Sequence, residues 1–173
     1  MELSKPTKDC HAPDRPEDAV GMLMPLEVFS VRLGGVAVPF ARPRWDGRNR
    51  RAYNAPRYDQ WKHGAALVMA GHWRRPPIER AVQVAVDVVL PRPQRKPGAG
   101  SVHRQYWQAD GAYPLPCRAD VDNLAKAALD ALQDARVILD DRLVVRLLAT
   151  KQAGDRPGVT VTVSVVEPGE SIL

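Results

Sequence analysis

The stretch that organises this chain is DVDNLAKAALDAL, residues 120–132, followed after five residues by ILDD at residues 138–141. Apolar residues in the first segment recur at steps of three and four, which predicts an amphipathic helix that begins near Asn123. Asp122 is then expected to be the N-cap of this helix, with Lys126 one turn later on the same side. Because acidic residues stand at both ends of the stretch, we expect it to supply a core helix and a chemical site together.

The acidic residues at the two ends of this stretch have enough chain between them to meet in space. A helix over residues 123–134 would be about 18 Å long, and an extended run over residues 135–140 would cover about 20 Å. A run that returns along the helix would bring the second acidic pair back to the helix N-terminus. The spacing therefore permits one site built from Asp120, Asp122, Asp140 and Asp141. It equally permits a capped helix with an Asp122–Lys126 pair and an Asp-Asp turn before a strand.

Carboxylates gathered in this way repel one another unless a cation lies between them. Ligands that are all oxygen suit Mg²⁺, or Mn²⁺ as a substitute. One or two such ions could activate a water and stabilise the leaving 3′ oxygen at a phosphodiester. Lys126 would then stabilise charge on the phosphate. No organic cofactor is predicted, and Cys10 and Cys117 are expected to be free thiols because no histidine stands at zinc spacing from them.

The remaining segments predict one domain with a mixed sheet. Strand patterns with alternating apolar residues occupy residues 26–33, 82–88, 142–150 and 159–165. A helical period covers residues 57–73, and its expected apolar face is Trp61, Ala65, Val68, Met69 and His72. Residues 151–157 are expected to join the last two strands as a hairpin. The fold class is therefore α/β (α+β), in the order β-α-β-α-β-β, with four strands and the helices on one face.

The domain is expected to cover residues 25–168, with a long basic loop at 91–118. Residues 1–24 are predicted to be a disordered tail and residues 169–173 a frayed end. Met22 and Met24 precede the first strand, so we expect one of them to be the natural start or residues 1–21 to be dispensable. Neither a secretory signal nor an apolar run of membrane-spanning length is present, so a cytoplasmic location is expected.

The net charge of +5 is concentrated in two segments. Residues 42–51 carry five arginines against one aspartate, a net of +4, and residues 91–118 also have a net of +4. The prolines near the first segment favour extended backbone, and Trp45 and Tyr53 are available to stack on bases. The predicted DNA-binding residues are Arg42, Arg44, Arg48, Arg50, Arg51 and Arg118. The alternative is an ordinary basic loop with no partner.

The segment from Asp120 to about Val166 resembles the RusA family of Holliday junction resolvases. The likeness rests on the order of its parts: Asp-x-Asp-Asn-Leu-x-Lys-Ala, then Asp-Ala-Leu, then hydrophobic-Leu-Asp-Asp, and finally two strands. This family is common in phages and prophages. The Pro- and Arg-containing segment upstream and the Tyr/Trp-containing helix resemble its phage branch. The resemblance assigns metal-binding and catalytic roles to Asp120, Asp122 and Asp141, and the role of the catalytic lysine to Lys126. It favours Asp141 over Asp140, which is kept as a further candidate metal ligand.

The resemblance also implies a magnesium-dependent homodimer that cuts four-way DNA junctions by paired, symmetric nicks, at the nucleoid of a bacterial or phage-infected cell. The sequence departs from the family pattern in its long 91–118 loop and in Cys117-Arg118-Ala119 before the acidic motif. Three alternatives stay open: a metal nuclease of the same fold for flaps, forks or other branched DNA, a catalytically silent DNA-binding protein, and a basic structural protein.

Overall fold

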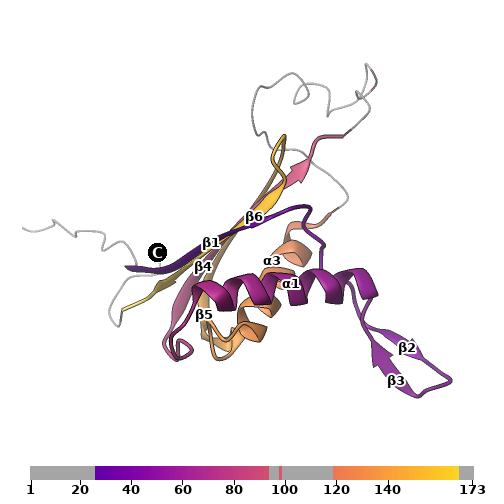
Figure 1. Cartoon of the computed structure of the whole chain (residues 1–173), viewed down its shortest axis with the longest axis horizontal. Coiled ribbons are helices and arrows are strands. Elements are labelled where there is room, and N and C mark those ends of the chain that lie inside the picture. Colours follow the sequence, from indigo (N-terminus) through magenta and orange to yellow (C-terminus); the bar gives the residue numbers. More distant parts are fainter. Residues whose placement is uncertain (1–25, 94–97, 99–118, 168–173) are drawn as a thin grey trace, which may run out of the picture.

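The structure is a computed structural model that describes residues 26–93, 98 and 119–167. In these residues two helices cover a four-stranded sheet, and a small separate hairpin lies beyond one end of the longer helix (Figure 1). The elements are β1 (Leu26–Gly34), β2 (Arg44–Asp46), β3 (Arg51–Tyr53), α1 (Pro56–His72), β4 (Val82–Pro91), α3 (Val121–Asp134), the short 3-10 turn η1 (Asp141–Leu143), β5 (Val144–Gly154) and β6 (Gly158–Val165). The predictions for residues 1–24, for most of the 91–118 loop and for residues 169–173 lie outside the described part of the chain.

The sheet has the strand order β1-β6-β4-β5 and is mixed, as predicted. Strand β4 is parallel to β5 and antiparallel to β6, and β1 is antiparallel to β6. The predicted hairpin between the last two strands is therefore wrong: β5 and β6 do not pair, and residues 155–157 carry the chain past β4. The physical reason is burial, because the valines of β6 fill the middle of the sheet whereas β5 is an edge strand with Leu147 and Leu148 exposed.

Gly158, the first residue of β6, permits this crossing. A Cβ atom at Gly158 would lie 2.7 Å from the backbone oxygen of Leu33 on β1, which is closer than two such atoms can approach. The absence of a side chain lets β6 enter the sheet beside β1 at this point.

The core lies on one face of the sheet, under the two helices, as predicted. Alternate residues of β4 and β6 point toward this face, and Val84 and Val163, which are opposite each other, are both fully buried. On the other face the strands carry polar groups, among them a hydrogen bond of 3.1 Å between the hydroxyls of Ser30 and Thr162. Full burial of each valine stabilises the fold by about 1.5–3 kcal/mol.

Helix α1 buries a face that overlaps the predicted one in part, because Ala65 and Met69 are buried and Trp61 packs against the core as expected. Val68 is 44% exposed and His72 is also exposed, so the prediction that these two residues belong to the apolar face is wrong. The buried residues are Tyr58, Ala65, Ala66 and Met69. Tyr58 decides the rotation of the helix, because its large side chain is 1% exposed and packs toward α3.

Helix α3 begins two residues earlier than predicted. Its N-cap is Asp120, whose backbone is extended and whose carbonyl accepts a hydrogen bond of 3.1 Å from the Leu124 backbone N–H. The prediction that Asp122 is the N-cap is therefore wrong, and Asp122 lies in the first turn. Seven apolar residues of the helix are buried, four of them alanines, which lets α3 lie close to both α1 and the sheet.

The arginine-rich segment forms a β-hairpin where the sequence predicted an extended arm. Strands β2 and β3 pair only with each other, in the register Arg44 opposite Tyr53 and Trp45 opposite Ala52. The carboxylate of Asp46 closes the turn, because it accepts hydrogen bonds from the backbone N–H groups of Arg48 and Asn49 and from the Asn49 side chain. This hairpin projects beyond the N-terminal end of α1 (Figure 1).

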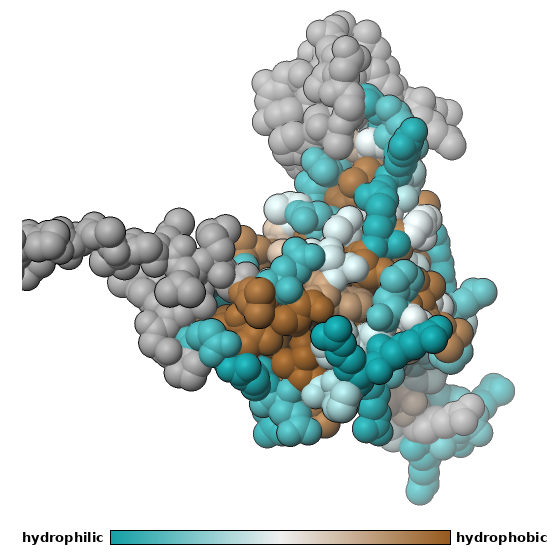
Figure 2. Space-filling model, turned by 60° about the vertical axis from the view of Figure 1, so that its left-hand side comes forward, coloured by the Kyte–Doolittle hydropathy of each residue, from teal (hydrophilic) through white to brown (hydrophobic). Residues whose placement is uncertain are grey.

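Some apolar side chains reach the surface and gather into a patch among polar ones (Figure 2). Leu26, at the start of β1, is 67% exposed. Neither α1 nor α3 is long and apolar enough to span a membrane, and the same holds for every helix in the described residues.

Candidate active site

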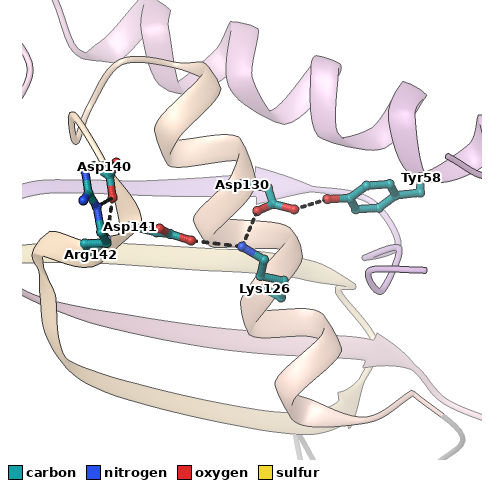
Figure 3. A network of polar contacts seen from close by, with 6 residues as sticks. All are labelled: Tyr58, Lys126, Asp130, Asp140, Asp141 and Arg142. Carbon is teal, nitrogen blue, oxygen red and sulfur yellow. Dashed lines mark hydrogen bonds and ion pairs between the residues drawn. The ribbon is translucent and has the colours of Figure 1, made fainter. Parts of the chain in front are cut away.

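Lys126 lies at the centre of the polar network in Figure 3. Its Nζ atom is 2.8 Å from Oδ1 of Asp130, one turn later on α3, and 3.0 Å from Oδ2 of Asp141, in the turn before β5. The hydrogen bond to Asp130, assisted by the one to Asp141, raises the pKa of Lys126. The side chain therefore stays a charged ammonium group with three donors at the site.

Tyr58 on α1 extends this network into the core. Its hydroxyl donates a hydrogen bond to Oδ2 of Asp130, and its ring packs edge-on against Phe40 with ring centroids 5.5 Å apart. Burial, together with the negative charge of Asp130, raises the pKa of Tyr58 above its ordinary range. The tyrosine is therefore a neutral hydrogen-bond donor. Asp130 accepts hydrogen bonds from Tyr58 on α1 and from Lys126 on α3 at the same time.

Asp140 and Asp141, adjacent in sequence, point to different partners (Figure 3). Asp140 accepts from the backbone N–H and the guanidinium of Arg142 at 2.9–3.1 Å. These hydrogen bonds hold the pKa of Asp140 below its ordinary value. Asp141 instead faces Lys126, so the structure distinguishes two aspartates that spacing alone could not separate.

Asp120 and Asp122 stand exposed at the start of α3. As N-cap, Asp120 makes no side-chain hydrogen bond to the helix, which leaves its carboxylate available. The residue before Asp120 is held against β5, because Nζ of Lys151 on β5 donates a hydrogen bond of 2.6 Å to the carbonyl of Ala119. The Asp122–Lys126 pair, which the spacing permitted as the alternative to a metal site, is replaced by the contacts of Lys126 with Asp130 and Asp141.

The four predicted metal ligands have the right chemistry for a hard cation, but they are not gathered around one point. In the described residues, no three Asp, Glu, His or Cys side chains form a group that could hold a metal ion. After α3 the chain reverses direction at Arg136, whose φ is +56°. The returning segment brings Asp141 to Lys126, and Lys126 lies one helical turn after Asp122 on α3. The ammonium of Lys126 is the cation that neutralises Asp141 in this arrangement.

The predicted DNA-binding arginines are grouped on the projecting hairpin. Arg42 and Arg44 are exposed on its entering side, and Arg48 and Arg50 are exposed in its turn. Within the described residues, none of these four arginines forms an ion pair with a carboxylate. The other two predicted residues are Arg51, which lies on β3, and Arg118, which lies outside the described residues.

The hairpin and the acidic end of α3 are connected. The backbone N–H of Phe40 donates a hydrogen bond of 2.9 Å to the carbonyl of Asn123, in the first turn of α3. Four residues later the chain enters β2, and after β3 it enters α1, which carries Tyr58. Both ends of the hairpin are therefore attached next to the Lys126 network.

Two members of the network, Asp130 and Tyr58, were not predicted as site residues. Asp130 could have been found, because an aspartate four residues after a lysine on a predicted helix is a favourable ion pair. Tyr58 had no comparable signal, since its contact with Asp130 joins residues far apart in the sequence. A hollow of about 470 Å³ elsewhere, lined by residues such as Trp73 and Ile78, includes none of these groups.

Most of the chain matches a known protein family. The family described as Endodeoxyribonuclease RusA matches residues 35–164, about three quarters of the chain. The matched region contains the hairpin, Tyr58, the whole Lys126 network and all four predicted metal ligands. No curated protein gives a significant match. Nucleases of the matched family cleave DNA and depend on a metal. Because the match covers the fold and the candidate site together, this chain belongs to the RusA family of endodeoxyribonucleases.

Proposed function

We propose that this protein is a magnesium-dependent endonuclease that resolves four-way DNA junctions by paired, symmetric nicks. The observation that carries the proposal is the contact between Lys126 and Asp141, which joins the acidic end of α3 to the second acidic pair of the motif. A charged lysine beside candidate metal-binding carboxylates suits phosphodiester hydrolysis, because an ammonium group and a bound cation can both stabilise the charge that develops on the phosphate.

Asp120, Asp122 and Asp141 are the proposed metal ligands. Their oxygen-only chemistry suits Mg²⁺, with Mn²⁺ as a substitute. When bound, the cation would supply an activated water and stabilise charge on the leaving 3′ oxygen. Asp140 is a fourth candidate, but it would have to release Arg142 in order to join them.

Lys126 is proposed to hold negative charge on the reacting phosphate. Its pKa is raised, so it acts as a cation and hydrogen-bond donor and not as a base. Its side chain is 41% exposed, which lets the ammonium reach a phosphate from solvent while Asp130 keeps hold of it.

The β2–β3 hairpin is proposed to contact the DNA. Its arginines would bind backbone phosphates, and Arg118 would contribute from the basic loop. Such contacts would give the protein affinity for DNA and fix its position without recognising the base sequence. Trp45 and Tyr53 are 67% and 43% exposed, and the cross-strand register places them on opposite faces of the hairpin. Aromatic rings on both faces suit unstacked bases at a branch point.

A homodimer is proposed because the substrate has two-fold symmetry. Paired nicks in two strands need two active sites, and a two-fold dimer supplies one for each strand. Size-exclusion chromatography with light scattering would test this, since a monomer at the concentration that cleaves junctions would contradict it.

The deciding experiment is a cleavage assay with purified protein. Labelled four-way junction, flap, fork and plain duplex are each incubated with Mg²⁺, with Mn²⁺ or with EDTA. We expect symmetric nicks in the junction that require the metal. Preferential cleavage of flaps or forks would favour the related nuclease activity, and the absence of cleavage with intact binding would favour a catalytically silent DNA-binding protein.

A further inference from the structure

Asp130 is the most firmly held partner of Lys126. It lies one helical turn after Lys126, so the backbone of α3 fixes the separation of the two residues. Its Oδ1 atom is 2.8 Å from Lys126 Nζ, and its Oδ2 atom accepts the Tyr58 hydroxyl. Only 18% of its side chain is exposed. Both carboxylate oxygens therefore have donors, and both donors are on packed helices.

Tyr58 orients this carboxylate. Its side chain is 1% exposed and its ring is fixed against Phe40, so the hydroxyl has little freedom to seek another acceptor. A buried hydroxyl without a partner is unfavourable, which keeps Tyr58 on Oδ2 of Asp130. The second oxygen of Asp130 is thereby directed at Lys126.

Asp141, the other partner of Lys126, is held less firmly. It lies in the short turn η1, its side chain is 39% exposed, and its contact with Lys126 is the longer of the two, at 3.0 Å. The proposed function engages Asp141 with a cation. Lys126 would then keep only Asp130.

We propose that Asp130, oriented by Tyr58, is the positioning residue that fixes the ammonium of Lys126 beside the reacting phosphate. The inference rests on the proposed function, because it takes Lys126 as the group that touches the phosphate. A lysine has a long side chain with many rotamers, so a fixed contact near its end removes most of the disorder that would weaken its effect on the reaction.

The structure offers a matched control on the same two helices. Lys62 on α1 and Asp134 on α3 form an ion pair at 2.8 Å, one turn along α3 from Asp130. This pair also joins α1 to α3, but it does not contact Lys126. The Asp134→Asn variant therefore removes an interhelical contact without removing the positioning of the lysine.

The first measurement compares the variants Asp130→Asn, Tyr58→Phe and Asp134→Asn with the unmodified full chain. Single-turnover cleavage of a four-way junction is measured with Mg²⁺, and the Kd for the same junction is measured without it. For Asp130→Asn we expect the rate to fall by about 10-fold to 100-fold while the Kd changes by less than about three-fold. Tyr58→Phe should change the rate in the same direction by a smaller factor, and Asp134→Asn should change neither quantity.

The second measurement observes Lys126 directly. The ¹⁵N–¹H correlation spectrum of the lysine ammonium groups is recorded without DNA or metal, and the Lys126 signal is assigned by its loss in Lys126→Ala. A hydrogen-bonded ammonium exchanges its protons slowly enough to be seen, so we expect the signal in the unmodified chain and in Asp134→Asn. In Asp130→Asn we expect it to broaden or disappear.

Three results would overturn the inference: cleavage by Asp130→Asn as fast as by Asp134→Asn, an unchanged Lys126 signal in Asp130→Asn, or equal losses of rate and junction binding, which would make Asp130 a residue that only supports the fold. If the unmodified chain cleaves no branched DNA, the proposed function fails by itself. The spectrum then decides the positioning of Lys126 independently.

Discussion

The ammonium of Lys126 lies 3.0 Å from the carboxylate of Asp141, and this contact connects α3 to the turn before β5. Asp140, the adjacent residue, is turned away and paired with Arg142. The two members of an Asp-Asp pair therefore have different surroundings, one within the lysine network and one within a local turn.

Asp141→Asn should lower the cleavage rate by about 100-fold or more, because it removes a proposed metal ligand that also contacts Lys126. Asp140→Asn should have a smaller effect, since its main contacts are with Arg142 in the same turn. Single-turnover rates of the two variants on one four-way junction test this. Similar losses in both variants would show that the pair acts as a unit.

Asp122→Asn should abolish cleavage and leave junction binding largely intact, because the amide keeps the size of the carboxylate but is a poor ligand for a hard cation. The measurement is a gel assay of nicking with Mg²⁺, together with a gel-shift assay of binding without it. Magnesium-dependent nicking by a clean preparation of this variant would refute the assignment of Asp122.

Lys126→Ala should lower the cleavage rate by about 100-fold to 1000-fold, as expected when a donor to developing negative charge is lost. The junction Kd should change much less, because one lysine is a small part of the contact with DNA. Rate and Kd are to be measured on the same preparation. Equal losses in both would count against a role in the transition state.

Arg48→Ala should weaken binding to junctions of different sequence by similar factors, because Arg48 is proposed to contact a phosphate. The slope of log K against log[salt] should decrease by about one unit for each phosphate contact that is lost. The matched control is Arg74→Ala, an exposed arginine beyond the other end of α1. An unchanged slope for Arg48→Ala, or an equal decrease for Arg74→Ala, would contradict the proposed role of the hairpin.

The hairpin turn should respond to acid through Asp46. The side-chain amide of Asn49 and the backbone N–H groups of Arg48 and Asn49 hold the pKa of Asp46 below its ordinary value of 3.8. The stabilisation of the turn by this carboxylate is therefore present above that pH and is lost as the pH falls through the lower pKa of the folded turn. The amide shifts of Arg48 and Asn49 should titrate below pH 3.8, and this titration should be absent in Asp46→Asn. A midpoint above 3.8 would exclude these hydrogen bonds in solution.

Much of the fold and of the candidate site could be predicted because the signals are local. The alternation of valines around Val84 and Val161 identifies strands, and the three- and four-residue steps after Leu124 identify the helix that buries them. The motif from Asp120 to Asp141 is a run of neighbouring residues, so its family likeness could be recognised without a structure.

Other features depend on contacts between residues far apart in the chain. The sequence shows two final strands, but β6 lies between β1 and β4 because its valines are buried more completely there than at an edge. The rotation of α1 follows from where Tyr58 fits against α3, and a helical period alone could not decide it. The arginine segment shows the same limit. Its prolines predict extended backbone, but the pairing of β2 with β3 depends on contacts that a local pattern does not reveal.

A helix that carries aspartates and Lys126 against a valine-rich sheet follows from local patterns, since periodicity and spacing are properties of neighbouring residues. The contacts of Lys126 with Asp130 and of Asp130 with Tyr58, and the orientation of Asp141 rather than Asp140 toward Lys126, emerge only when the chain is folded. Such contacts depend on folding because a hydrogen bond needs its donor and acceptor within about 3 Å of each other. For Tyr58 and Asp130 that proximity exists only after α1 and α3 have packed on the same face of the sheet.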